Sequence, residues 1–270
     1  MVRVGRLSLR RGGPLFLIAG PCVIEDRAHT LRLAGALTAI TKRLRIPFVF
    51  KASYDKANRL SADSYRGPGL DEGLDVLSAV KERYRVPVLS DVHCRSEVAR
   101  AAEVLDVIQI PAFLCRQTDL LTAAASTGKP INIKKGQFIA PWDMKHIVAK
   151  AEKAGAREII LTERGVSFGY NNLVSDMRAI PVMQQSGYPV VFDATHSVQL
   201  PGGLGSASGG QREMIPVLAR AAVAAGCDGI FVEVHDNPDK ALCDGPNSLH
   251  IGQIAGLLRR LKAISEAVRH

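Results

Sequence analysis

The sequence predicts an α/β fold, a (β/α)8 barrel of the TIM type with a short N-terminal β-hairpin. Strand-like apolar runs alternate with helix-like segments eight times along the 270 residues, which is the order of such a barrel. Several of the runs are continuously apolar, as expected of parallel strands buried on both faces. No shift in composition marks a linker, so residues 1–270 are expected to form a single barrel domain.

The elements follow one another in a regular order. Residues 2–9 are strand-like and precede the turn-like sequence RRGG, which predicts the hairpin. The apolar runs predict barrel strands over residues 15–19, 47–51, 87–91, 107–110, 131–134, 158–162, 189–193 and 229–233. The periodic segments between and after them predict helices over residues 29–44, 70–84, 96–105, 118–125, 142–154, 173–185, 212–225 and 251–268.

An open, doubly wound sheet is the alternative fold. It would more often carry a glycine-rich nucleotide fingerprint after its first strand, and no G-x-G-x-x-G stands there. Polar residues stand at or just past the end of every predicted strand, and in a barrel they converge on the catalytic rim. In chain order they are Cys22; Lys51; Asp91 and His93; Gln109; Lys134 and Lys135; Glu163 and Arg164; Asp193 and His196; Glu233, His235 and Asp236.

Composition narrows the function classes. Lys plus Arg number 35 against 26 Asp plus Glu, a net charge of +9, which suits anionic partners. Aromatic residues are only 5% and no basic stripe is interleaved with them, which disfavours nucleic acid. No apolar run approaches the roughly 20 residues of a membrane span, and the N-terminus lacks a signal peptide, so a cytoplasmic location is expected. The five cysteines are scattered without a C-x-x-C pair, which argues against a disulfide framework.

The stretch FKASYDKANR at 50–59 predicts a binding site for a small phosphorylated anion. An apolar strand ends at Lys51, and Lys56 and Arg59 follow with almost no countercharge. Lys134 and Arg164, at two other strand ends, are expected to join them. Lys134 is alternatively a Schiff-base nucleophile, as in barrel aldolases.

A second group has the chemistry of a metal site. Cys22, His196, Glu233 and Asp244 follow the first, seventh and eighth strands, and their donor atoms suit divalent Fe, Zn, Mn or Co. Alternatives remain open for several members. Cys22 can be a small buried residue. His235 is a rival ligand because it lies two residues from Glu233 on a strand. Asp236 and Asp239 compete with Asp244.

The glycine-rich sequence PGGLGSASGGQRE, residues 201–213, follows the seventh strand and precedes a helix. One interpretation is a phosphate cradle at the barrel rim. The others are a mobile lid and a long surface loop.

Long motifs resemble those of the 3-deoxy-D-manno-octulosonate 8-phosphate synthase family. They are AGPC at 19–22, FKASYDKANR at 50–59, IQIPAFLCRQTDLL at 108–121, NIKKGQF at 132–138, LTERG at 161–165, FGYNN at 168–172 and DATHSVQLPGG at 193–203. The resemblance implies a (β/α)8 barrel, a homotetramer, and the condensation of phosphoenolpyruvate with arabinose 5-phosphate in lipopolysaccharide biosynthesis. C3 of phosphoenolpyruvate attacks the aldehyde, water adds at C2, and phosphate leaves.

The resemblance also implies roles for single residues. Lys51, Asp91, Lys134 and His196 are the expected catalytic residues, with Asp91 contacting the sugar or polarising water. Arg116 is expected to reach a neighbouring subunit's site. Phosphoenolpyruvate would be held by Lys51, Ser53, Lys56, Gln109, Lys134 and Arg164; arabinose 5-phosphate would be held by Asn58 and Arg59; and Phe113 joins the substrate-binding set.

Cys22, His196, Glu233 and Asp244 match the metal ligands of the family's metal-dependent branch. The metal-independent branch has Asn in place of Cys22, so Cys22 predicts a bound divalent metal that orients or polarises the aldehyde or activates the water. Two features depart from the pattern. Leu60 replaces a serine of the usual KANRSS, and Cys243 is associated with the metal-independent branch.

Two other functions are weighed against this one. The first is the sister 3-deoxy-D-arabino-heptulosonate 7-phosphate synthase, which uses erythrose 4-phosphate, but its KPRTS sequence is absent here. The second is a non-catalytic protein that binds a phosphometabolite. It would explain the cationic rim but not the Cys, His, Glu and Asp set beside it.

Overall fold

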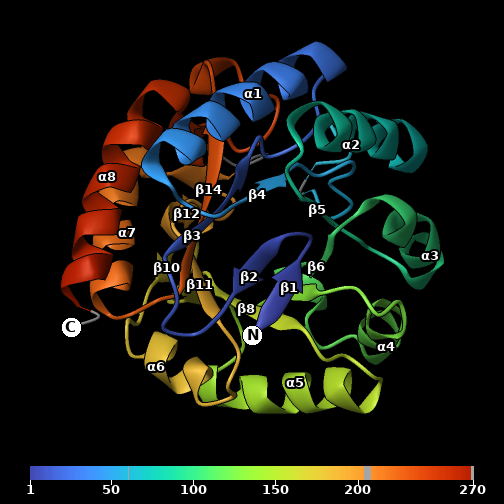
Figure 1. Ribbon diagram of the computed structural model, residues 1–270, viewed down its shortest axis with the longest axis vertical. Coiled ribbons are helices and arrows are strands. Elements are labelled where there is room, and N and C mark those ends of the chain that lie inside the picture. The colour runs from blue at the N-terminus through green and yellow to red at the C-terminus, as the bar shows by residue number, and fades with distance from the viewer. Residues whose placement is uncertain (60, 204–207, 269–270) are drawn as a thin grey trace.

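Parallel strands close into a barrel in the computed structural model, which describes residues 1–59, 61–203 and 208–268 (Figure 1). Each strand pairs with the next along the chain, and β14 closes the ring by pairing with both β3 and β11. The (β/α)8 barrel is confirmed. Its strands are β3 (Phe16–Gly20), β4 (Phe48–Lys51), β5 (Val88–Asp91), β6 (Val107–Ile110), β7 (Ile131–Lys134), β8 (Ile159–Glu163), β11 (Val190–Asp193) and β14 (Gly229–His235).

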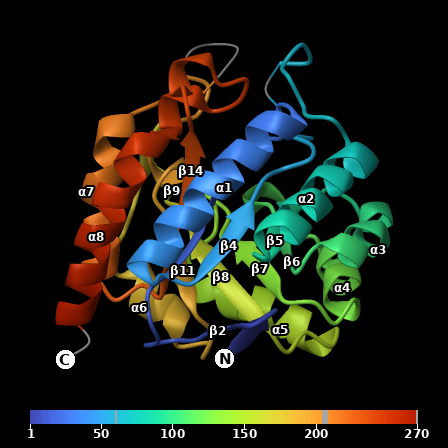
Figure 2. The same ribbon diagram turned by 45° about the horizontal axis from the view of Figure 1, so that its top comes forward.

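Helices surround this barrel and turn their apolar faces to the outer sides of the strands (Figures 1 and 2). In the first helix Leu33, Ala34 and Leu37 are buried in the core between helices and strands, at the spacing of one helical face. The helices are α1 (Arg27–Leu44), α2 (Leu70–Tyr84), α3 (Arg95–Val104), α4 (Thr118–Ser126), α5 (Met144–Lys153), α6 (Ala179–Gln184), α7 (Ile215–Ala224) and α8 (Ile251–Ala267). None of the described helices is long and apolar enough to cross a membrane.

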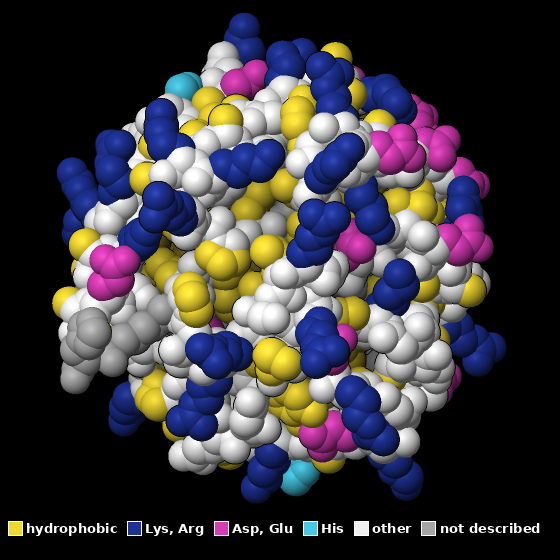
Figure 3. Space-filling model, viewed as in Figure 1, with side chains coloured by type: hydrophobic (Ala, Val, Ile, Leu, Met, Phe, Trp, Pro, Cys, Tyr) yellow, Lys and Arg dark blue, Asp and Glu magenta, His cyan; other side chains and the backbone are white. Residues whose placement is uncertain are grey.

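The N-terminal hairpin covers one end of the barrel. Strands β1 (Val2–Val4) and β2 (Leu7–Leu9) pair antiparallel, as predicted, and lie over the centre of the ring in Figure 1. Val2, Val4 and Leu9 pack with barrel residues such as Phe16 and Phe231 in one buried cluster. Figure 3 shows Lys and Arg side chains spread over this face rather than gathered in one patch. The opposite end, where the strands finish, holds the functional side chains.

One predicted helix is wrong over its first half. The segment 173–185 is not a single helix: Leu173–Val174 (β10) pairs with Val166–Ser167 (β9), and α6 begins only at Ala179. Gly169 and Asn171 have left-handed backbone conformations that let the chain reverse between the two short strands. The other predicted boundaries differ by a few residues. The helices expected from 142 and from 212 begin with 3-10 turns, Pro141–Asp143 and Arg212–Met214.

Candidate active site

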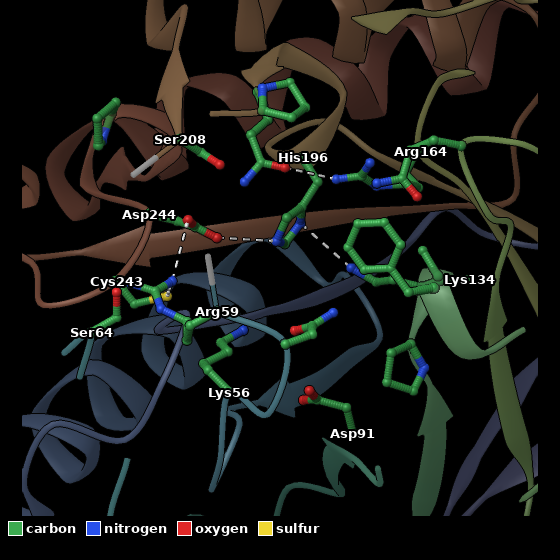
Figure 4. A pocket seen from close by; sticks show the side chains of 18 of the residues that line it. Lys56, Arg59, Ser64, Asp91, Lys134, Arg164, His196, Ser208, Cys243 and Asp244 are labelled. Atoms are coloured by element: carbon green, nitrogen blue, oxygen red, sulfur yellow. Dashed lines mark hydrogen bonds and ion pairs between the residues drawn. The ribbon is translucent and has the colours of Figure 1, made fainter. Parts of the chain in front are cut away.

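A cavity of about 500 Å³ opens at the carboxyl ends of the strands. It gathers side chains that are up to 195 residues apart in the sequence, from Lys51 at the end of β4 to Pro246 in the loop after β14. Figure 4 shows His196 near its centre, between Lys134 and Asp244, with Arg59 and Arg164 on either side. The predicted site residues that line it are Lys51, Lys56, Asn58, Arg59, Asp91, Gln109, Phe113, Lys134, Arg164, His196 and Asp244.

The other predicted site residues lie outside the lining. Cys22 is buried next to Asp244, and Glu233 is buried next to His196 and Asp244. Ser53 is fully buried, and its hydroxyl donates to Oδ1 of Asp91 at 2.5 Å. Arg116 is exposed, away from the cavity of its own chain.

Asp244 connects the four candidate metal ligands, because it belongs to two overlapping groups of donors, His196–Glu233–Asp244 and Cys22–Cys243–Asp244. Nε2 of His196 lies 3.6 Å from a carboxylate oxygen of Glu233 and 3.6 Å from one of Asp244. Sγ of Cys22 lies 3.5 Å from the same oxygen of Asp244. Donor atoms that share a tetrahedral ion at 2.0–2.3 Å stand about 3.3–3.7 Å apart, so the spacing fits. Oε2 of Glu233 is buried without a hydrogen-bond partner among the described residues. The donor set therefore fits a divalent transition metal.

Backbone geometry explains how these ligands come together. A side chain at Gly20 would place its Cβ 1.9 Å from the carbonyl oxygen of Lys51, so only glycine lets β3 end this close to β4. Cys22 follows two residues later. Asp244 adopts a left-handed conformation with φ of 49°, which an Asp tolerates better than most residues. This turn aims its carboxylate back at His196.

Cys243 lies against the same set. Its Sγ is 2.8 Å from Sγ of Cys22 and 2.9 Å from Nη1 of Arg59, and all five cysteines are free thiols. Burial and the neighbouring Cys243 raise the pKa of Cys22 well above its usual value. A bound cation would offset this by favouring the thiolate.

The rival ligands are placed elsewhere. His235 groups with Glu25 and His29, so it is not a member of the cluster around His196. Oδ1 of Asp236 lies 3.0 Å from Nε2 of His29, and Asp239 accepts a hydrogen bond from Arg212. Glu233 and His235 both lie on β14, which ends at His235, but His235 belongs to the group with Glu25 and His29 and does not line the cavity.

A buried ion pair occupies the floor of the cavity. Nζ of Lys134 donates to Oδ2 of Asp193 at 2.5 Å and lies 3.5 Å from Nδ1 of His196. The same nitrogen lies 3.7 Å from the ring centre of Phe231. Burial outweighs the attraction of Asp193 and lowers the pKa of Lys134. Asp193 was not predicted as a site residue, although its position at a strand end, beside a histidine, was a signal.

Lys51 links the metal set to the rest of the rim. It is 1% exposed, and its Nζ donates to Oε1 of Glu233 at 2.8 Å and to the carbonyl of Cys22 at 2.7 Å. Burial opposes the ionisation of Glu233, but His196 and Lys51 outweigh it and lower its pKa to about 2. Glu233 is therefore a carboxylate at neutral pH.

A second acid–imidazole group surrounds Asp91. Nε2 of His93 lies 3.1 Å from Oδ2 of Asp91, and Nδ1 lies 3.7 Å from Glu97. Burial opposes the charge on His93, but Asp91 and Glu97 outweigh it and raise its pKa to about 9. His93 and Glu97 were not among the predicted site residues. His93 stood at a strand end, but nothing in the sequence indicated that Glu97 would reach it.

Two arginines leave buried N–H groups without a partner in the described part of the chain. Nη1 of Arg164 and Nε of Arg59 are both unpaired. Nη2 of Arg164 donates to Gln199 at 3.0 Å. Because a buried guanidinium N–H without an acceptor is costly, both groups are suited to bind anions.

The glycine-rich segment contributes to the rim. Gln199–Leu200 (β12) pairs with Gly209–Gly210 (β13), and Pro201, Gly202 and Ser208 line the cavity. Residues 204–207, and with them the choice between cradle and lid, lie outside the described residues, as does Leu60.

Comparison with known proteins places this barrel among phosphosugar-acid synthases. The sequence profile of the DAHP synthetase I family matches residues 7–270, so the chain belongs to that family. Two relatives are named 2-dehydro-3-deoxyphosphooctonate aldolase. The one from Desulfosudis oleivorans is 67% identical over 97% of this chain and 94% of its own length. The one from Geotalea daltonii is 63% identical over 99% of this chain and 98% of its own length. These matches confirm the resemblance to 3-deoxy-D-manno-octulosonate 8-phosphate synthases, to which that name also refers.

Proposed function

We propose that this chain condenses phosphoenolpyruvate with D-arabinose 5-phosphate and water to give 3-deoxy-D-manno-octulosonate 8-phosphate and inorganic phosphate, in lipopolysaccharide biosynthesis. One observation carries the proposal. A single cavity joins two arginines that have unpaired buried N–H groups to a converging Cys, His, Glu and Asp set. The relatives' printed names support the same reaction.

Phosphoenolpyruvate occupies the side of the cavity formed by β6, β7 and β8. Arg164 offers its unpaired Nη1 to the phosphate or carboxylate as part of a charge-assisted fork. Lys134 and Gln109 lie on the neighbouring strands, with Lys51 and Lys56 across the cavity. Ser53 acts through Asp91, to which its hydroxyl is bonded.

Arabinose 5-phosphate occupies the side formed by the loop after β4. Arg59 binds its phosphate, and Asn58 and Phe113, which also line the cavity, contact the sugar. This places the aldehyde toward His196, because Arg59 and His196 face the two oxygens of the same carboxylate, that of Asp244 (Figure 4).

Cys22, His196, Glu233 and Asp244 hold one divalent ion, Fe, Zn, Mn or Co. When bound, the ion supplies Lewis-acid polarisation of an oxygen and lowers the pKa of water. Lys51 neutralises part of the charge of Glu233 and fixes its carboxylate. Asp193 accepts a hydrogen bond from the backbone N–H of His196 and faces its Nδ1 at 2.7 Å, so it holds the ring in place.

The residues around the cavity can serve the proton transfers of the reaction. As C3 of phosphoenolpyruvate bonds to the aldehyde carbon, the aldehyde oxygen takes up a proton. The ammonium of Lys134, whose pKa is lowered, is suited to donate it. Water that adds at C2 loses a proton, which balances the one taken up by the aldehyde oxygen. Burial opposes the charge on Asp91, but His93 and Lys56 outweigh it and lower its pKa, so Asp91 stays a carboxylate and can orient this water by accepting a hydrogen bond from it. Phosphate then leaves from C2, held by the arginine and lysines.

We further propose that the chain assembles into a homotetramer. Phe113, Phe138, Trp142, Phe168 and Tyr170 are each more than half exposed, and all stand on loops after β6, β7 and β8. Aromatic residues gathered near one rim suit a protein interface. Arg116, on the same side, is then free to reach the neighbouring cavity. Sedimentation of the wild type as a monomer at micromolar concentration would contradict this assembly.

Phosphate release tests the substrate assignment. The protein is incubated with phosphoenolpyruvate and either arabinose 5-phosphate or erythrose 4-phosphate, and inorganic phosphate is measured with the sugar acid product. Turnover with the five-carbon sugar supports the proposal, and turnover with erythrose 4-phosphate alone supports the sister reaction. Binding of phosphoenolpyruvate without turnover on either sugar would favour the non-catalytic alternative.

A further inference from the structure

We propose that Glu25 is a positioning residue that fixes the loops carrying the candidate metal ligands. Glu25 does not line the cavity and contacts none of these ligands directly. The inference rests on the proposed metal site and explains how this chain keeps that site assembled.

One carboxylate oxygen connects three parts of the chain. Oε1 of Glu25 accepts a hydrogen bond from the backbone N–H of Leu242 at 2.8 Å and lies 3.3 Å from Nε2 of His235. Glu25 stands three residues after Cys22 on the loop that follows β3. Leu242 stands two residues before Asp244, and His235 two residues after Glu233. A single side chain thus ties the segments that provide three of the four candidate ligands.

The hydrogen bonds of His235 define how it meets Glu25. The backbone N–H of Asn237 donates to Nδ1 of His235 at 2.9 Å. In the neutral ring the proton is then on Nε2, which faces Glu25. The ring is also tilted against that of His29, with centres 4.5 Å apart, and His29 is held by Asp236. The ring of His235 is therefore held with its Nε2 3.3 Å from the carboxylate of Glu25.

The link is shielded from solvent. The side chains of Glu25 and His235 are 16% and 8% exposed. The hydroxyl of Tyr65 holds the backbone of the same turn, since it lies 3.0 Å from the carbonyl of Ile24 and 3.2 Å from that of Glu25. On the far side of the last loop, Arg212 donates to the carbonyl of Gly245 at 2.7 Å. Asp244 lies between Leu242, which is held by Glu25, and Gly245, which is held by Arg212. Loss of Glu25 therefore frees one end of the loop that carries Asp244.

Glu25, His29 and His235 are themselves a group of carboxylate and imidazole donors that could hold an ion. The hydrogen bonds oppose this alternative. With Nδ1 of His235 accepting from Asn237, Nε2 carries a proton and has no lone pair to offer a metal. We therefore assign the group to positioning, and the metal stoichiometry decides between the two.

The test compares Zn²⁺ affinity, measured by competition with a chromophoric chelator, in the metal-stripped wild type and four variants. Glu25→Met keeps the side chain's length and removes its acceptors, and Glu25→Ala is the second deletion should Met impair folding. Glu25→Gln keeps an oxygen that can accept from Leu242 and His235. Glu158→Ala is the matched control, because Glu158 also accepts a backbone N–H from a distant segment, that of Arg3 at 2.9 Å, at the other end of the barrel.

We expect Glu25→Met and Glu25→Ala to weaken Zn²⁺ binding by about 10- to 100-fold, as losses behind a metal ligand commonly do. Glu25→Gln restores most of the affinity, and Glu158→Ala binds like the wild type. Thermal unfolding of the metal-free proteins separates this effect from a general loss of stability.

Unchanged Zn²⁺ affinity in both deletion variants would overturn the inference while leaving the proposed metal site intact. A second Zn²⁺ equivalent in the wild type that disappears with Glu25 would also overturn it, in favour of a separate metal site. A wild type that binds no Zn²⁺, Co²⁺, Fe²⁺ or Mn²⁺ would overturn the metal assignment and this inference together.

Discussion

Lys134 and Asp193 form a buried ion pair, with 2.5 Å between Nζ and Oδ2, between the proposed phosphoenolpyruvate site and the candidate metal site. Asp193 also faces Nδ1 of His196, which belongs to the candidate metal set. The carboxylate thus orients a lysine for substrate on one side and a histidine for metal on the other. Removing the charge of Asp193 should therefore disturb the position of Lys134 and that of His196.

Asp193→Asn is expected to reduce kcat by about 100-fold or more and to weaken metal binding, because the amide cannot hold both partners. It leaves Lys134 as an uncompensated buried cation, which costs about 3–5 kcal/mol of unfolding free energy. Steady-state kinetics and urea unfolding measure the two effects. Asp176→Asn is the control: its pair with Arg178 is exposed, and such pairs contribute little. Near-normal kcat in Asp193→Asn would contradict the assigned role.

The pKa of His93, raised to about 9, predicts a pH dependence of stability. The folded pKa lies above the ordinary 6.5, so the folded state binds the proton more tightly than the unfolded state. This contribution, about 3 kcal/mol, is complete below pH 6.5 and is lost as the pH rises through 9. We expect unfolding free energy to fall over this range in the wild type and much less in His93→Gln. His146→Gln, which alters an exposed histidine, should keep the wild-type profile.

Arg59 and Arg164 are expected to separate the two substrates kinetically. Arg59→Ala should raise KM for arabinose 5-phosphate by about tenfold or more and leave KM for phosphoenolpyruvate nearly unchanged, since a charge-assisted hydrogen bond contributes about 1.5–3 kcal/mol. Arg164→Ala should show the reverse. Initial rates with each substrate varied in turn give both constants. Equal effects of either variant on both KM values would refute the assignment of separate sides.

Cys22 and Cys94 provide a matched pair of cysteine substitutions. Cys22→Ala is expected to lose bound metal and most activity, because it removes one of four converging donors. Cys94→Ala is expected to change neither, because Cys94 is exposed and its thiol forms hydrogen bonds with Ser96 and Glu97, which do not line the cavity. Metal content by elemental analysis and phosphate release are the two measurements. Full activity of Cys22→Ala in metal-free buffer would reduce Cys22 to a packing residue.

The sequence predicted the barrel because each strand is a short apolar run with polar residues at or just past its end, and the rim follows from that order alone. Lys51, Gln109 and Lys134 could be placed because they stand at or next to the last residue of a strand. Asp193 and Glu25 were not predicted as site residues, since the barrel brings Lys134 to Asp193, and Leu242 and His235 to Glu25. His93 was not predicted either, although its partners Asp91 and Glu97 are near in sequence. The helix at 173–185 was wrong because pairing of Leu173–Val174 with Val166–Ser167 outweighed local helical periodicity. The rival ligand His235 lies two residues from Glu233 on β14 but groups with Glu25 and His29, which the spacing alone did not indicate.

The most direct test of the central claim is phosphate release from phosphoenolpyruvate and arabinose 5-phosphate, before and after treatment with a chelator. A metal held by Cys22, His196, Glu233 and Asp244 predicts activity that is lost with the chelator and restored by a divalent transition metal. Turnover that persists unchanged in chelator-treated, metal-free protein would contradict the metal site and leave a synthase that works through its lysines and arginines alone.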